Sequence, residues 1–100
     1  MGVTTAVRCV FSAAHADPLT GAQHGHDYEV IATFPGDELR RFEVLQERLR
    51  GILRAFDHRV LADDLWSAES LAKALGSVLG DAIQVQVNRP WLGHFATWTP

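Results

Sequence analysis

Three histidines have the spacing of a metal site. His24 and His26 stand two residues apart in the segment QHGHDYEV, and His15 ends the segment FSAAH. On an extended strand, side chains two residues apart leave the same face, so both imidazoles of the pair would point one way and His15 would supply a third ligand. Three neutral imidazoles leave one tetrahedral position open, which is typical of catalytic zinc. The alternative is a solvated H-x-H pair, but His15 at the end of another apolar strand favours the metal.

A second candidate is the adjacent acid–base pair Asp57 and His58. An aspartate that accepts a hydrogen bond from an imidazole fixes the tautomer of that imidazole and raises its basicity. Taken alone, the pair is more simply explained as a histidine at a helix C-terminus, stabilised by the helix dipole. Neighbouring side chains do not always face each other, so the contact forms either within one chain or between subunits.

The elements that position these residues follow from the spacing of apolar side chains. Alternation over residues 5–15 predicts a half-buried strand, and Asp17-Pro18 with Gly21 predicts a loop. A second alternating strand is expected over 24–34, with Tyr28 and Phe34 on its buried side. His15 and the H-x-H pair then lie at the neighbouring ends of two consecutive strands.

Two helices and two strands are expected to complete the chain. Apolar steps of three and four predict an amphipathic helix of about five turns over residues 39–56. A second helix is expected after Ser67, a good N-cap in a Ser-x-x-Ser start, and before Gly80. Strands are expected at 83–87 and 95–98, separated by Pro90. The two predicted stripes are Leu39, Phe42, Leu45, Leu49, Ile52, Leu53 and Phe56, then Leu71, Ala72, Leu75, Val78 and Leu79.

This order predicts one α+β domain over residues 1–100, with a four-stranded antiparallel sheet, two helices on one face and the chain order ββααββ. One hundred residues support one core, and much of the surface would need a partner subunit. Nine Lys and Arg against twelve Asp and Glu, with no basic run, argue against a nucleic-acid partner. The sequence shows neither a membrane span nor a secretory signal, and the single Cys9 permits no internal disulfide, so we expect a cytoplasmic protein.

The segments FSAAH, HGHDYEV, FDHRVL and SAESLA, in this order between about Phe11 and Leu75, resemble the 6-pyruvoyl-tetrahydropterin synthase and 6-carboxy-tetrahydropterin synthase family. The resemblance implies the tunnelling fold (T-fold), zinc on the three histidines, and proton transfer by Asp57 and His58. It also implies trimers or hexamers with active sites between subunits. Glu69 would belong to the catalytic segment at the second helix, although a carboxylate in a first helical turn is equally explained by the helix N-terminus.

Two positions depart from the family pattern. Thr20 stands where the family has a reactive cysteine, and a threonine hydroxyl is a far weaker acid than a thiol. Cys9 is no substitute, because six residues of extended strand place it roughly 20 Å from His15. Asn88 stands nearest to the glutamate that anchors the pterin ring in the family, and an amide pairs less well with that ring. The chain resembles a shortened, divergent member without the usual catalytic cysteine.

The sequence therefore predicts a zinc-dependent lyase, aldolase or isomerase that acts on a pterin-like or other small metabolite. Metal would polarise a substrate oxygen, and Asp57 with His58 would move a proton. Thr20, Asn88 and Trp91 are expected at the substrate, although an aromatic residue near a C-terminal strand more often seals a subunit interface. His94 is either an exposed residue or a replacement acid–base group. The alternative function is a non-catalytic zinc-binding oligomer that serves ligand binding or assembly.

Overall fold

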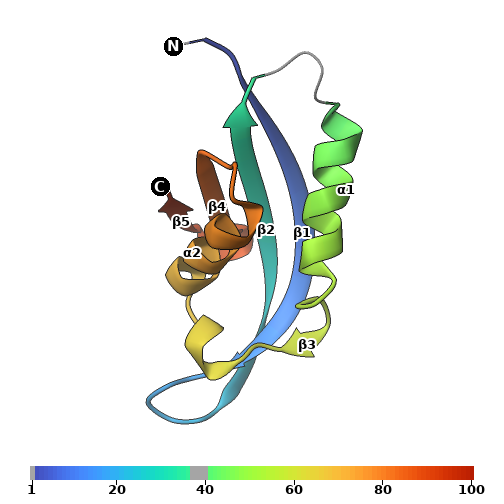
Figure 1. Ribbon diagram of the computed structural model, residues 1–100. Coiled ribbons are helices and arrows are strands. Elements are labelled where there is room, and N and C mark those ends of the chain that lie inside the picture. Colours follow the sequence, from blue (N-terminus) through green and yellow to red (C-terminus); the bar gives the residue numbers. More distant parts are fainter. Residues whose placement is uncertain (1, 37–40) are drawn as a thin grey trace.

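A long antiparallel hairpin forms the centre of the computed structural model, which describes residues 2–36 and 41–100. Strand β1 (Thr4–Ala16) pairs along its whole length with β2 (Gln23–Pro35), and the register places His15 opposite His24. The tip of the hairpin projects beyond the helices (Figure 1). Alternation sets the two faces, since the odd-numbered β1 residues from Thr5 and the even-numbered β2 residues from Tyr28 to Phe34 are buried while their neighbours are more exposed.

The turn at the tip is organised by Asp17, as its sequence predicts. Its side-chain Oδ1 accepts hydrogen bonds from the backbone N–H groups of Leu19 and Thr20, at 2.7 and 3.2 Å. Gly21 adopts a positive φ of 74°, which a residue with a side chain rarely takes. These local bonds fix the hairpin register and with it the placement of the histidines.

The sheet has five strands in the order β3-β1-β2-β4-β5, so the expected four-stranded antiparallel sheet is wrong in detail. The additional strand β3 (Arg59–Val60) is only two residues long and runs parallel to β1. A strand this short has no alternation to detect, and both of its residues are exposed. The remaining strands, β4 (Gln84–Arg89) and β5 (His94–Trp98), confirm the two expected near residues 83–87 and 95–98.

Two helices cover one face of this sheet, as predicted. Helix α1 (Phe42–Leu53) packs along β1, and α2 (Ala68–Leu79) packs on β4 and β5 (Figure 1). The core between them contains leucines from both helices and the buried side of the hairpin. Its largest fully buried apolar or aromatic side chains are Tyr28, Phe34, Leu49, Leu71, Leu75, Leu79, Val30, Val85 and Val87. Neither α1 nor α2 packs on the opposite face of the sheet, which is called the helix-free face below.

The helical stripes are shorter than predicted. Helix α1 ends at Leu53, because residues up to Phe56 form turns closed by bonds of the i to i−3 type. Phe42 at the other end and Val78 in α2 are exposed, against the expectation that both join the core. Leu39 lies outside the described residues.

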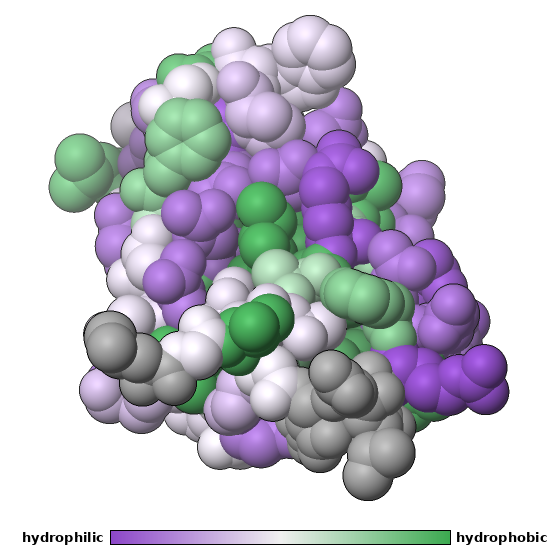
Figure 2. Space-filling view, turned by 90° about the horizontal axis from the view of Figure 1, so that it is seen from above, coloured by the Kyte–Doolittle hydropathy of each residue, from purple (hydrophilic) through white to green (hydrophobic). Residues whose placement is uncertain are grey.

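The space-filling view from above shows hydrophobic side chains gathered near the middle of this end of the molecule, with hydrophilic side chains around them (Figure 2).

Local signals at α2 are confirmed. The Ser67 side-chain oxygen accepts a hydrogen bond from the Ser70 N–H at 3.1 Å, and the Ser70 side-chain oxygen accepts one from the Ser67 N–H. The two bonds form a capping box. Gly80 ends the helix. Within α2, Gly76 is required by packing, because a Cβ there would lie 2.3 Å from the ring of Trp98. Two short 3₁₀ helices, η1 (Asp63–Leu65) and η2 (Pro90–Leu92), link the elements, and no helix among the described residues is long and apolar enough to cross a membrane.

Candidate functional site

The buried face of the hairpin brings two of the three histidines into direct contact. The Nε2 atoms of His15 and His26 lie 3.0 Å apart, and their rings are stacked. Two nitrogens on one tetrahedral zinc lie about 3.3 Å apart, given Zn–N bonds of about 2.0–2.1 Å. The Nδ1 of His15 faces the Ala16 carbonyl at 3.3 Å, which fits a proton on Nδ1. The lone pair on Nε2 of His15 then accepts a hydrogen bond from Nε2 of His26, and a bound metal would use the same lone pair. This pair therefore has the separation of two metal ligands.

The third histidine lies near the pair but is exposed. The ring centroid of His24 lies 5.9 Å from that of His15, and the His24 side chain is exposed. Across residues 2–36 and 41–100, no three His, Cys, Asp or Glu side chains are already arranged to hold a metal ion. The donor set nevertheless fits zinc, because an exposed side chain across the ladder from His15 changes rotamer at little cost.

The electrostatics favour neutral imidazole at His26. Burial lowers the pKa of this side chain, and the positive charge of Arg89 lowers it further, followed by His15, His24 and His94. A neutral imidazole is the form that binds metal. Trp66 lies beside His15 with ring centroids 6.2 Å apart, and His15 is only 6 % exposed. Packing therefore holds the first histidine in place.

The acid–base pair forms within one chain. The Nδ1 of His58 lies 2.9 Å from Oδ1 of Asp57, and the same carboxylate oxygen accepts the Ser12 backbone N–H at 3.0 Å. The Ser12 hydrogen bond, and then contact with His58, hold the pKa of Asp57 below its usual value. Asp57 thus stays ionised and orients the imidazole, which leaves Nε2 of His58 to face outward.

His58 is presented to its surroundings by an unusual backbone. It has a φ of +58°, and its N–H donates to the Ser12 carbonyl at 2.6 Å. A non-glycine residue in the left-handed region carries strain of roughly 1–2 kcal/mol. The side chain is 82 % exposed and, with Asp57, lines a pocket of about 590 Å³ whose other walls include Asp27 and Trp91.

The two chemical groups have different main surroundings but share one cavity. His15 and His26 lie with the buried side of the hairpin, next to Tyr28. The pocket that Asp57 and His58 line together opens among Ser12 and other side chains of the helix-free face. A further cavity of about 450 Å³ is lined by both His26 and His58, so His58 of one copy also borders the histidine end of its own hairpin.

Three expected substrate or catalytic residues have other surroundings. Asn88 is 2 % exposed, and its Nδ2 donates to Glu29 at 3.0 Å, on the helix-free face. Thr20 lies in the hairpin turn, where its Oγ1 accepts from Ala22 N at 3.2 Å. Glu69 is exposed in the first turn of α2, the place at which the helix N-terminus alone explains a carboxylate. Of the predicted substrate residues, Trp91 is the one that lines the pocket of Asp57 and His58.

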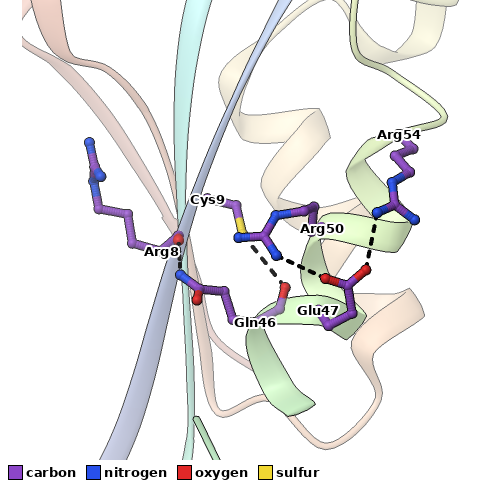
Figure 3. Close-up of polar contacts among 6 residues, drawn as sticks. All are labelled: Arg8, Cys9, Gln46, Glu47, Arg50 and Arg54. Carbon is purple, nitrogen blue, oxygen red and sulfur yellow. Dashed lines mark hydrogen bonds and ion pairs between the residues drawn. The ribbon is translucent and has the colours of Figure 1, made fainter. Parts of the chain in front are cut away.

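Cys9 has a structural environment. Its side chain points toward α1, and Sγ lies 3.7 Å from the Gln46 carbonyl (Figure 3). Burial raises the pKa of this thiol, although the charge of Arg50 partly offsets the effect. Nearby on α1, Glu47 binds both Arg50 and Arg54 (Figure 3). A neutral, enclosed thiol of this kind is no nucleophile.

Sequence reasoning missed Arg89 and Tyr28, which adjoin the histidines. The guanidinium of Arg89 lies over the ring of Tyr28, 5.6 Å from its centroid, and Tyr28 contacts His26 edge-on. Tyr28 follows His26 by two residues on an alternating strand, so its place on the same face was available from spacing. Arg89 carried no such signal, because its position depends on the pairing of β4 with β2.

No protein-family model matches this chain, and no curated protein matches its sequence.

Proposed function

We propose that this protein is a zinc-dependent enzyme of the lyase, aldolase or isomerase type, related to 6-pyruvoyl-tetrahydropterin synthase and built on the T-fold. The observation that carries the proposal is the 3.0 Å separation of the His15 and His26 Nε2 atoms. His24, across the ladder from His15, is the third ligand after a change of rotamer. Bound zinc would polarise a substrate carbonyl or hydroxyl oxygen.

The proton-transfer group is His58, and Asp57 is its positioning residue. The 2.9 Å contact between them supports this assignment, because an ionised aspartate on Nδ1 leaves the other nitrogen free to exchange a proton with a substrate. The exposed imidazole and the neighbouring Trp91 supply a surface against which a small molecule can pack.

The active site is proposed to form between copies of the chain. The pocket that Asp57 and His58 line together on the helix-free face supports this arrangement, while the cavity bordered by both His26 and His58 is the place where a site within one copy would form. A neighbouring copy in a trimer or hexamer would supply His58 to the metal of the first, since symmetric assembly brings unlike surfaces together around a ring.

Mixing two inactive variants tests this arrangement. His15→Ala and His58→Ala proteins are each expected to lose turnover, whereas co-refolding them in equal amounts restores about a quarter of the wild-type sites, as random assembly of two-chain sites requires. Refolding each variant alone is the control. No restoration, with both assemblies of normal size, would place the complete site within one copy.

The substrate is tested separately. The zinc-loaded protein is incubated with dihydroneopterin triphosphate and assayed for side-chain elimination. Because Thr20 and Asn88 replace family residues, we expect slow turnover at best there and faster turnover of another small carbonyl or hydroxyl compound. Purified protein without stoichiometric divalent metal would end the proposal.

The second candidate is a non-catalytic zinc-binding oligomer, favoured by the turn position of Thr20 and the exposure of Glu69. It predicts metal content and assembly like those above, but no reaction that depends on His58. The exposed, strained His58 argues for the enzyme, because a scaffold gains nothing from that backbone.

A further inference from the structure

A cavity of about 420 Å³ lies between the histidine end of the hairpin and η2. Its walls include His24 and His26 on one side and Arg89 and Trp91 on the other. The cavity therefore adjoins the proposed metal ligands and is separate from the contact between Asp57 and His58. A substrate held here would lie against the imidazoles.

Arg89 brings a positive charge that is not matched by a carboxylate. Across residues 2–36 and 41–100, the ion pairs involve other cationic side chains and none includes Arg89. Its Nη2 donates to the Trp66 carbonyl at 3.2 Å, while its Nε is buried without a hydrogen-bond partner. Leaving a buried donor unsatisfied costs about 1–3 kcal/mol, more when the group is charged, so such a group usually has a function.

Tyr28 is a second unpartnered group beside the same histidines. Its side chain is 0 % exposed and its hydroxyl has no hydrogen-bond partner in the described structure. Burial raises the pKa of Tyr28, whereas Arg89, which sits over the ring face, lowers it by less through its charge and its side-chain contact with the hydroxyl. This contact leaves the hydroxyl without a hydrogen bond of normal geometry. The Arg89 guanidinium and the Tyr28 hydroxyl therefore both lie beside His26, at positions where stability alone would favour apolar side chains.

Two formally charged side chains line this cavity, Arg89 and Asp27. The Asp27 carboxylate accepts a hydrogen bond from the Ser12 hydroxyl at 2.5 Å, whereas Arg89 has no carboxylate partner among the described residues. The guanidinium is therefore the group in this cavity that can attract an anion.

We propose that Arg89, whose guanidinium lies over the ring of Tyr28, binds an oxyanion of the substrate in the cavity that it lines together with His24 and His26. The substrate of the proposed reaction is then a small carboxylate or phosphate compound. This inference rests on the proposed function for the identity of the neighbouring metal. A planar guanidinium suits either group, since its parallel N–H donors match two oxygens at once.

The test measures anion binding by calorimetry, with pyruvate as the carboxylate probe and inorganic phosphate as the other. Metal-free and zinc-loaded wild-type proteins are compared with Arg89→Gln, Arg89→Lys and Tyr28→Phe. Arg41→Gln, an exposed arginine just before α1, is the matched control for loss of one charge. The probe that binds more tightly identifies the oxyanion.

Arg89→Gln is expected to weaken binding at least about tenfold, because it removes the charged donor that lines the cavity. Tyr28→Phe should weaken binding less, because the buried hydroxyl acts on the anion only through its contact with Arg89. Arg89→Lys should fall between wild type and Arg89→Gln, while Arg41→Gln binds like wild type. The proposal is overturned if Arg89→Gln binds like wild type, or if the wild type binds neither probe. Should Arg89→Gln not fold, unchanged affinity in Arg89→Lys overturns it.

The two proposals fail in different ways. Anion binding that needs Arg89 in a protein without stoichiometric metal supports the oxyanion site and rejects the zinc enzyme. If the protein contains stoichiometric zinc and Arg89→Gln binds anions as the wild type does, the zinc enzyme is supported and the oxyanion site is rejected.

Discussion

The histidines of the hairpin and the histidine that follows α1 are held by opposite means. His15 is buried, packed against Trp66 and in contact with His26. His58 is exposed and is held by its backbone, which bonds to Ser12 in a strained conformation, and by a single carboxylate. The first region fixes its imidazole through packing, and the second through main-chain geometry.

This difference agrees with the two roles proposed for these residues. A metal ligand gains from a rigid, desolvated position that keeps it neutral and aimed at one point. A proton-transfer group that serves a neighbouring copy must instead stand free of its own core, and the left-handed backbone projects it outward. The experiments below separate these roles, beginning with the largest expected effect.

Removing the exposed imidazole should cost the most turnover. His58→Gln keeps a polar side chain of similar length but cannot exchange a proton, so kcat on the substrate is expected to fall about 10²- to 10⁴-fold. Zinc content and assembly size should remain unchanged. Steady-state kinetics with His94→Gln alongside sharpen the comparison, because an equal loss in His94→Gln would move the acid–base role to that residue.

Removing the buried imidazole should instead cost metal. His15→Ala is expected to weaken zinc binding by more than about 100-fold, which exceeds the usual effect of losing an outer partner of a ligand. His24→Ala should have a smaller effect, since His24 is exposed and has to reorient. Competition with a zinc-binding dye measures both variants. Equal losses would show that burial of His15 adds nothing to binding.

His58→Gly should separate strain from catalysis. Glycine adopts a φ of +58° without penalty, so the variant is expected to gain up to about 1 kcal/mol in the free energy of unfolding while losing turnover. Denaturant unfolding measures the gain, and His58→Ala, which keeps the strain, is the control. Stability at or below that of His58→Ala would show that the backbone is not strained at this position.

The smallest expected effect is on the acid side of the stability profile. The pKa of Asp57 is lower in the folded chain than its unfolded value of about 3.9, so its contribution to stability is present above that value and is lost as pH falls through the folded pKa. Asp57→Asn should therefore flatten the fall of Tm between about pH 5 and the acid limit. Thermal unfolding at several pH values, with Asp64→Asn as control, tests this; parallel profiles for wild type and Asp57→Asn would contradict it.

Patterns within one element were enough to predict most of the fold. Alternation located β1 and β2, and Ser67 with Gly80 bounded α2. The errors arose where tertiary contacts decide the outcome. Strand β3 exists because residues after α1 meet the β1 edge, and Phe42 stays exposed although it continues the stripe of α1.

The candidate site likewise contains some contacts that local spacing predicts and others that depend on the tertiary structure. His15 and His26 come together because pairing of consecutive strands is a local matter, and spacing predicted it. Two other contacts join segments that are far apart in the chain: Asp57 with Ser12, and Arg89 with Tyr28. They could not be predicted, because no sequence pattern shows which strand β3 or β4 pairs with. Asn88 was expected at the substrate, yet its side-chain amide donates a hydrogen bond to Glu29 on the neighbouring strand.

Strand β1 is thirteen residues long, yet its outer edge is paired with β3 only at Ala13 and Ala14 among the described residues. On that edge, the Gln46 side-chain amide donates a hydrogen bond to the Arg8 carbonyl, and the Ser12 N–H donates one to the Asp57 carboxylate. These two positions are therefore not available for pairing with another strand. A freshly synthesised copy still exposes main-chain donors and acceptors that would template any extended segment it meets. Higher expression levels and refolding concentrations are therefore expected to favour pairing of this edge with extended segments of other copies.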